Sequence, residues 1–190
     1  MIDYSMLKAI SKISDDQKVK SIVNSLNPNQ QNSKNWLITE SLKYFQAFEQ
    51  PRFLVAAGWY GLLANKLTEF GNALSFDKDP QCKTIGEKLY PNVKFKTYDM
   101  VDYRSVKEHD VILCTSCEHI EQDLLNEFIS RRRKDDSIVI LQSNNYYKLP
   151  EHINCVENED EFESKLKLKM THFKGSLQCD GFKRFMIIGA

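Results

Sequence analysis

Polar side chains that can exchange protons gather in residues 114–119, which read Cys-Thr-Ser-Cys-Glu-His and follow a short apolar run. An imidazole exchanges a proton near neutral pH and a carboxylate can accept one, so Glu118 and His119 are candidate catalytic groups. Ser116 beside them could contact a substrate. The structural alternative is that Glu118 caps the following helix and His119 packs at its first turn.

The same run contains a Cys-x-x-Cys motif, Cys114 and Cys117, which is compatible with redox chemistry or zinc binding. A zinc site of this kind normally needs a second pair of ligands at a similar spacing. The sequence offers no second cysteine pair. Buried thiols are therefore the simpler interpretation, and we predict no metal site.

A second polar cluster, Gln-Ser-Asn-Asn-Tyr-Tyr at residues 142–147, follows another apolar run. The amides of Gln142 and Asn144 and the phenol of Tyr146 could hydrogen-bond to a flat substrate or stack on it. The alternative is a solvated loop rich in turn-forming residues. His152 and Asn154 could join the same rim.

A glycine-containing turn lies between two further apolar runs. Residues 53–64 read Phe-Leu-Val-Ala-Ala-Gly-Trp-Tyr-Gly-Leu-Leu-Ala, and the next apolar run ends in Asp77. A strand, a glycine turn, a helix and a strand ending in an acid are typical of doubly wound sheets that bind adenosine-type ligands. Asp77 would accept both ribose hydroxyls. An ordinary turn and a pair of solvated acids, Asp77 and Asp79, are the alternatives.

The elements that position these groups alternate along the chain from residue 53, which predicts a parallel sheet with helices on both faces. Two apolar runs around Asp180-Gly181 predict a C-terminal antiparallel hairpin. We therefore expect an α/β, doubly wound, Rossmann-like and mostly parallel seven-stranded sheet. The expected strands are 53–57, 73–76, 93–98, 110–115 and 137–142, and the expected helices are 61–69, 81–89, 120–131 and 160–168.

The first fifty residues are expected to be helical. Residues 14–17 form a capping-box pattern that opens one helix, which Asn27-Pro28 ends, and a second helix is expected over 34–48. We therefore divide the chain into a helical N-terminal extension, 1–50, and an α/β domain, 51–190. The extension could cover a pocket or form a homodimer contact, and the sequence leaves both open.

Composition limits the partners of the protein. The 190 residues carry 26 basic and 26 acidic side chains, which argues mildly against binding nucleic acid by charge alone without excluding a local patch. The cations at 131–134 could be such a phosphate contact or a solvated helix end. No segment has the length or apolarity of a membrane span or a signal peptide, and five cysteines fit reduced thiols. We expect a cytoplasmic protein.

Parallel strands finished by a hairpin resemble the plan of the class I S-adenosylmethionine-dependent methyltransferases. Residues 53–64 match in length that family's pattern Val-Leu-Asp-Leu-Gly-Cys-Gly-Thr-Gly-Leu-Leu-Ala. Ala57, Trp59 and Gly61 take the three glycine positions, and Val55 takes that of the acid. The resemblance covers about residues 50 to 190. The motifs Gly-Trp-Tyr-Gly, Thr-Ser-Cys-Glu-His and Gln-Ser-Asn-Asn are similar to those of small uncharacterised, often phage-encoded, methyltransferase-like proteins.

The resemblance implies S-adenosylmethionine as the cofactor. Asp99 would accept from the adenine amino group and the Met100 backbone N–H would meet a ring nitrogen, while Trp59 could stack on a ligand or fill the site. The implied cofactor contacts are Gly58, Trp59, Gly61, Asp77, Asp99, Met100 and Thr115.

The implied function is methyl transfer to an oxygen or nitrogen of an unknown acceptor, a small molecule or a macromolecule. The Asn-Pro-Pro-Tyr type of motif that serves base amino groups is absent after residue 117, which makes adenine-N6 and cytosine-N4 chemistry less expected. One alternative is a non-catalytic or repurposed S-adenosylmethionine- or nucleotide-binding module that acts through a protein partner. Another is an enzyme that cleaves the cofactor.

Overall fold

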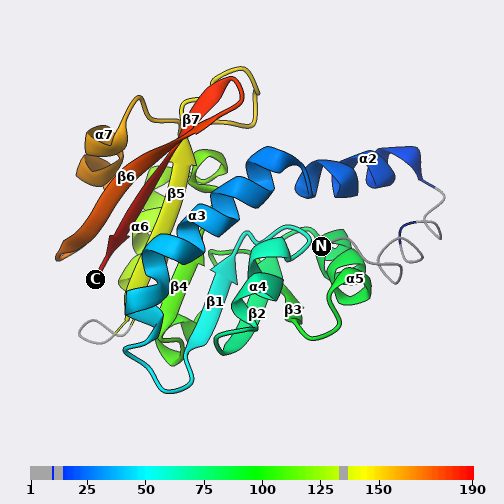
Figure 1. The fold of residues 1–190 in the computed structure, drawn as a ribbon, viewed down its shortest axis with the longest axis horizontal. Coiled ribbons are helices and arrows are strands. Elements are labelled where there is room, and N and C mark those ends of the chain that lie inside the picture. The colour runs from blue at the N-terminus through cyan, green and yellow to red at the C-terminus, as the bar shows by residue number, and fades with distance from the viewer. Residues whose placement is uncertain (1–9, 11–14, 133–136) are drawn as a thin grey trace.

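A seven-stranded sheet forms the centre of the computed structural model, which describes residues 10, 15–132 and 137–190 (Figure 1). The strand order is β3-β2-β1-β4-β5-β7-β6; β1 to β5 run parallel, and β7 lies antiparallel to β5 and to β6. This arrangement confirms the predicted fold. The strands are β1 Arg52–Ala56, β2 Asn72–Asp77, β3 Lys94–Thr97, β4 Val111–Cys114, β5 Ile138–Asn144, β6 Thr171–Cys179 and β7 Phe182–Gly189.

Helices cover both faces of this sheet. Helices α3 and α4 lie in front of the strands and α6 lies behind them (Figure 1). The helices are α2 Asp16–Ser25, α3 Pro28–Phe45, α4 Leu62–Leu67, α5 Pro80–Leu89, α6 Gln122–Ser130 and α7 Glu159–Lys165, and the 3₁₀ turns are η1 Ser105–Glu108 and η2 Cys117–His119. None of the helices in the described ranges is both long and apolar enough to cross a membrane.

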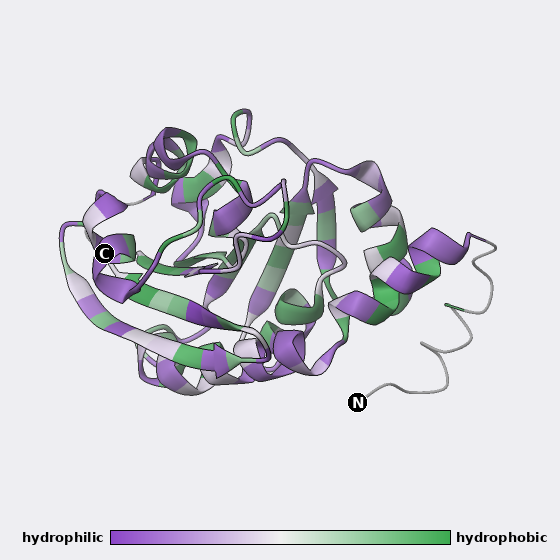
Figure 2. Ribbon diagram, turned by 90° about the horizontal axis from the view of Figure 1, so that it is seen from above, coloured by the Kyte–Doolittle hydropathy of each residue, from purple (hydrophilic) through white to green (hydrophobic). Residues whose placement is uncertain are grey.

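Alternating side chains of the central strands build two cores. Phe53 and Val55 of β1 join the core beneath α3 and α4, whereas Leu54 and Ala56 join the core beneath α6. The middle strands therefore carry mostly hydrophobic residues, while the outer elements mix both kinds (Figure 2). A strand buried on both faces has no solvent-facing side for polar residues, which explains the continuous apolar runs in the sequence.

The second helix begins earlier than expected. The sequence pattern places it at 34–48, but α3 starts at Pro28, and the side chain of Asn27 caps it by accepting from the Gln30 backbone N–H at 2.9 Å. Proline fits the first helical position because its missing N–H would have no partner there. Helix α2 is capped by Asp15; Ser14, the predicted start of the capping box, lies outside the described residues.

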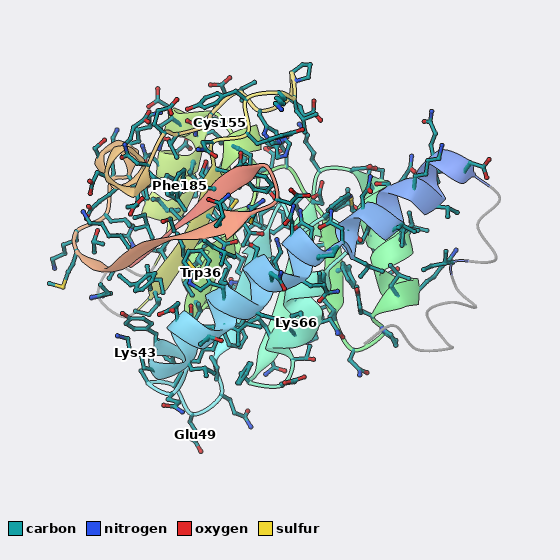
Figure 3. The ribbon with its side chains drawn as sticks, turned by 45° about the horizontal axis from the view of Figure 1, so that its top comes forward. Trp36, Lys43, Glu49, Lys66, Cys155 and Phe185 are labelled. Carbon is teal, nitrogen blue, oxygen red and sulfur yellow. The ribbon has the colours of Figure 1, made fainter. Side chains whose placement is uncertain are left out.

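Helix α3 packs closely against the rest of the fold. Its Leu37 and Phe45 are buried in the core that also contains Phe53. Trp36 points from α3 toward the hairpin, where its ring meets Phe173 of β6 edge-on at 6.4 Å (Figure 3). The core of the sheet thus includes α3, and a division of the chain at residue 50 remains a prediction.

Candidate functional site

A cavity of about 890 Å³ opens at the carboxyl ends of β1, β2 and β4. The strand order reverses between β1 and β4, and ligands of doubly wound sheets bind at this switch point. The volume lies within the range of roughly 300–1,000 Å³ usual for ligand pockets. Residues of α2 and α3 also line the cavity, so the N-terminal helices cover it.

The glycine turn keeps an unusual backbone. Ala57 and Trp59 both have a φ of 49°, and Gly61 has a φ of 90°. The left-handed region costs a residue with a side chain about 1–2 kcal/mol, which is why glycine is preferred there. Ala57 and Trp59, which stand at two glycine positions of the resemblance, therefore adopt a conformation that glycine would adopt at lower cost. Trp59 lines the cavity and stacks on Tyr60 at 5.3 Å between ring centroids.

The two glycines of the turn have different roles. Gly58 lines the cavity, and a Cβ on it would lie 2.1 Å from the Ser75 hydroxyl oxygen. Gly61 is not among the residues that line the cavity. It is the N-cap of α4, and a Cβ on it would lie 2.4 Å from the ring of Phe95. Its absence of a side chain serves the packing of the turn on β3, which sequence spacing does not reveal.

Asp77 ends β2 beside this turn, where it lines the cavity. Its Oδ2 accepts from the Trp59 backbone N–H and its Oδ1 from that of Asp79, both at 3.1 Å. These bonds orient the half-buried carboxylate, which keeps lone pairs for further donors. Asp99 and Met100 also line the cavity: Asp99 is exposed and accepts from the Val101 N–H at 3.0 Å, whereas Met100 is buried.

Glu118 lies buried at the opposite end of the cavity, 3% exposed. It lies in η2 and caps no helix, because Glu121 precedes α6. The Asn144 side-chain amide donates to its Oε1 at 2.6 Å, and the Arg184 guanidinium lies 3.7 Å from the same oxygen. Asn144 is fixed in turn, because its Oδ1 accepts from the Tyr146 backbone N–H at 2.8 Å.

Two imidazoles lie beside Glu118. The rings of His119 and His152 meet edge-on with centroids 4.5 Å apart. Nδ1 of His119 lies 3.2 Å from the Glu151 carbonyl oxygen, and Nδ1 of His152 lies 2.6 Å from that of Tyr146. Both residues line the cavity, His119 exposed and His152 half-buried, so His152 joins the rim as expected.

Thr115, a predicted cofactor contact, lines the cavity. The remaining predicted substrate contacts divide into two groups. Ser116, Asn144 and Tyr146 line the cavity. Gln142 does not: it is fully buried, and its Oε1 accepts from the Ser33 hydroxyl at 2.9 Å. Gln142 therefore ties β5 to α3.

Among the lining residues that escaped the sequence interpretation are two buried cations, Lys34 and Arg184. Burial, together with the positive charge of Arg184, lowers the pKa of Lys34 to about 7. Lys34 lies one turn before Leu37 on the buried side of α3, and Arg184 stands at the start of the apolar end of β7. In both cases the signal available in the sequence was a charged residue at a position that the surrounding apolar pattern assigns to the core.

The Cys-x-x-Cys motif and the basic run make hydrogen bonds within the fold. The Cys117 thiol donates to the Cys114 carbonyl at 3.5 Å, and burial raises the pKa of Cys117 well above its usual value. In the basic run, Arg131 donates to the carbonyls of Met100 and Tyr103, at 3.0 and 3.2 Å. Residues 133 and 134 of that run lie outside the described residues.

No protein-family model matches the sequence, and no curated protein matches it. Solved structures do share the fold. The N-methyltransferase NodS from Bradyrhizobium japonicum WM9, in complex with S-adenosyl-L-homocysteine, has a TM-score of 0.70 at 10% identity, covering 98% of each chain. Magnesium protoporphyrin IX methyltransferase (ChlM) from Synechocystis PCC 6803, with the same compound bound, has a TM-score of 0.70 at 11% identity, covering 98% of this chain and 94% of that one.

A third similar structure is an S-adenosylmethionine-dependent methyltransferase from Clostridium acetobutylicum ATCC 824. Its TM-score is 0.62 at 14% identity, over 82% of this chain and 89% of that one. At these identities the likeness establishes the fold: the chain has the Rossmann-like fold of class I methyltransferases, over nearly its full described length.

Proposed function

We propose that this protein is an S-adenosylmethionine-dependent methyltransferase. The observation that carries the proposal is the juxtaposition of the glycine turn and Asp77 at the switch point of a methyltransferase-like sheet. Ala57 and Trp59 retain a strained backbone there without being glycine. Strain of this kind concentrates at functional sites, where a ligand needs the conformation.

The residues at this end of the cavity fit the cofactor. Asp77 has free acceptor capacity for the ribose hydroxyls, and Asp99 with Met100 would meet the adenine. Gly58 keeps the turn close to β2, with its N–H bonded to the Phe76 carbonyl at 3.0 Å. Thr115 borders the cofactor end at the tip of β4. When bound, S-adenosylmethionine supplies an activated methyl group.

The opposite end would receive the methyl acceptor. Tyr146 and Ser116 line it and would orient the acceptor by hydrogen bonds, which matters because transfer requires in-line alignment. Glu118 and His119 are the predicted groups for handling the acceptor's proton. The helices α2 and α3 would limit the access of water. We also retain as predictions a cytoplasmic location, a homodimer contact and the likeness to phage-encoded proteins.

Calorimetry of the full chain with S-adenosylmethionine and S-adenosylhomocysteine tests the proposal. We expect both compounds to bind and Asp77→Ala to weaken binding at least about tenfold, because one lost charged hydrogen bond is worth about 1.5–3 kcal/mol. Asp102→Ala is the matched control, since Asp102 is exposed and outside the cavity lining. Absence of binding to both compounds would refute the proposal.

A repurposed binding module is the second candidate, favoured by Val55 and Trp59. Val55 is buried where the resemblance has an acid that helps hold the cofactor's amino group, and Trp59 projects a large ring at the cavity. Such a module would bind adenosine without preferring the methionine-containing compounds. A preference of the full chain for S-adenosylhomocysteine over adenosine supports the methyltransferase, and equal affinity supports the module.

A further inference from the structure

We infer that Glu118, His119 and His152 form a binding site for a divalent first-row transition-metal ion at the acceptor end of the cavity. One ligand atom from each residue can be chosen so that all three lie within 4.8 Å of one another. Two imidazoles and one carboxylate are a common ligand set for zinc and for iron(II), and they leave coordination positions open. The sequence interpretation missed this set because His152 lies far along the chain from the other two.

The tautomers of both histidines are suited to a metal. Nδ1 of His119 and Nδ1 of His152 each face a backbone carbonyl oxygen, that of Glu151 and that of Tyr146. A carbonyl only accepts, so each Nδ1 carries the proton and each Nε2 keeps its lone pair. Metal-binding histidines usually donate their second ring N–H in this manner, which fixes the ring and its tautomer.

The carboxylate is arranged in the same way. The Asn144 amide and the Arg184 guanidinium both approach Oε1 of Glu118, at 2.6 and 3.7 Å. No described residue donates a hydrogen bond to Oε2, although this oxygen is buried. A buried carboxylate oxygen without a partner is costly, and an ion at this position would satisfy it. This unpartnered oxygen is an observation independent of the histidine geometry.

Binding an ion requires the three ligands to draw closer together. In a tetrahedral site with metal–ligand distances of about 2.0–2.2 Å, two ligand atoms lie about 3.3–3.6 Å apart. The three ligand atoms fall within 4.8 Å, and the exposed His119 is the ligand that would move, lengthening its 3.2 Å contact with the Glu151 carbonyl oxygen. Because two of the three ligands are nitrogen, the site favours zinc, cobalt or iron(II) over magnesium, which prefers oxygen.

The ion would also define the acceptor. This step rests on the proposed function: an ion with open positions beside the acceptor space would bind an oxygen of the acceptor, such as a hydroxyl. A bound cation lowers the pKa of a coordinated hydroxyl, so its proton is lost to solvent more readily. The histidines would then serve as ligands in place of a proton acceptor.

Titration of the chelator-treated full chain with Co²⁺, followed by visible absorption and calorimetry, tests the site. We expect one ion per chain and at least about tenfold weaker binding in His152→Ala, His119→Ala and Glu118→Gln. His172→Ala is the matched control, because His172 is an exposed imidazole on β6 outside the cavity lining. Cys155→Ser should also retain binding, although its thiol lies 3.8 Å from His152 Nδ1.

The outcomes separate this inference from the proposed function. If Glu118→Gln fails to fold, the exposed His119 and the half-buried His152 still decide the result. Absence of cobalt binding, or equal binding by the histidine variants and the wild type, would overturn the site. Calorimetry with S-adenosylhomocysteine on the metal-free chain tests the proposed function alone, so either proposal can fail while the other stands.

Discussion

The two ends of the cavity are built in different ways. At the cofactor end, the acids accept from backbone N–H groups: Asp77 from that of Trp59, and Asp99 from that of Val101. At the acceptor end, Glu118 is held by Asn144 and Arg184, which come from β5 and β7. Both ends therefore need the assembled sheet, but the cofactor end relies on backbone groups, whereas the acceptor end relies on buried charged side chains.

This difference indicates at which end of the cavity side chains could be replaced without loss of the fold. The turn is held in its course with side chains present, since Ala57 and Trp59 have a φ of 49° without being glycine. The acceptor end has buried charged side chains that hydrogen-bond to or compensate one another. Replacing one of them leaves the others buried without a partner, which lowers the stability of the fold. We therefore expect the cofactor end to tolerate side-chain changes that leave the backbone alone, and the acceptor end to lose stability with single truncations.

The largest expected effect tests the limit of that tolerance. Gly61→Ala combines a left-handed φ of 90° with a Cβ 2.4 Å from the Phe95 ring, and should cost about 3–4 kcal/mol of unfolding free energy. Gly181→Ala is the matched control, since its φ is 80° but nothing lies within 4 Å of the added Cβ. It should cost about 1 kcal/mol. Urea denaturation measures both, and equal losses would contradict the packing role.

Truncation at the acceptor end is expected to cost about 3 kcal/mol. Asn144→Ala removes the amide that donates to Glu118 at 2.6 Å, leaving a buried carboxylate with less compensation. Asn145→Ala is the control: its Oδ1 accepts from the Lys183 backbone N–H at 2.7 Å, a half-buried neutral bond worth about 1 kcal/mol. If the two variants are equally stable by urea denaturation, the acceptor end has no special dependence on buried charge.

The sequence predicted the sheet well for a physical reason. Strands buried on both faces need apolar runs, and the Asp-Gly turn specifies a hairpin, so both are visible in a single chain segment. Gln142 was misplaced because a polar residue after an apolar run has the same pattern whether it faces the cavity or, as here, α3. The grouping of His119 with His152 depends on how the loop after β5 folds back, which no local pattern encodes.

A pH dependence of about 2 kcal/mol is expected from Lys34. Burial lowers its pKa to about 7, with Arg184 opposing the charge and Glu118, Cys114 and Cys179 favouring it. Above pH 7 the folded chain has lost the proton while the unfolded lysine keeps it up to about pH 10.5. Stability should therefore rise with pH by roughly 1.4 kcal/mol per unit within this window, and not below it.

Urea denaturation at about pH 7 and at about pH 8.5 measures that rise, because the first pH lies near the start of the window and the second lies inside it. Lys34→Met should lack it and be the more stable form at the lower pH. Lys43→Met is the control, because Lys43 is exposed on α3 and points away from the sheet (Figure 3); it should follow the wild type. A parallel pH profile in Lys34→Met and the wild type would mean that Lys34 stays charged in the folded chain.

The smallest expected effect concerns the strained turn itself. Ala57→Gly relieves a φ of 49° but adds the backbone entropy of glycine, so its net effect should lie within about 1 kcal/mol of zero. Ala56→Gly, one residue earlier in β1, loses a buried methyl group with no strain to relieve and should cost about 1–2 kcal/mol. Urea denaturation compares the neighbours directly. If Ala57→Gly is as costly as Ala56→Gly, the turn is not strained, and its backbone gives no support to a ligand that requires it.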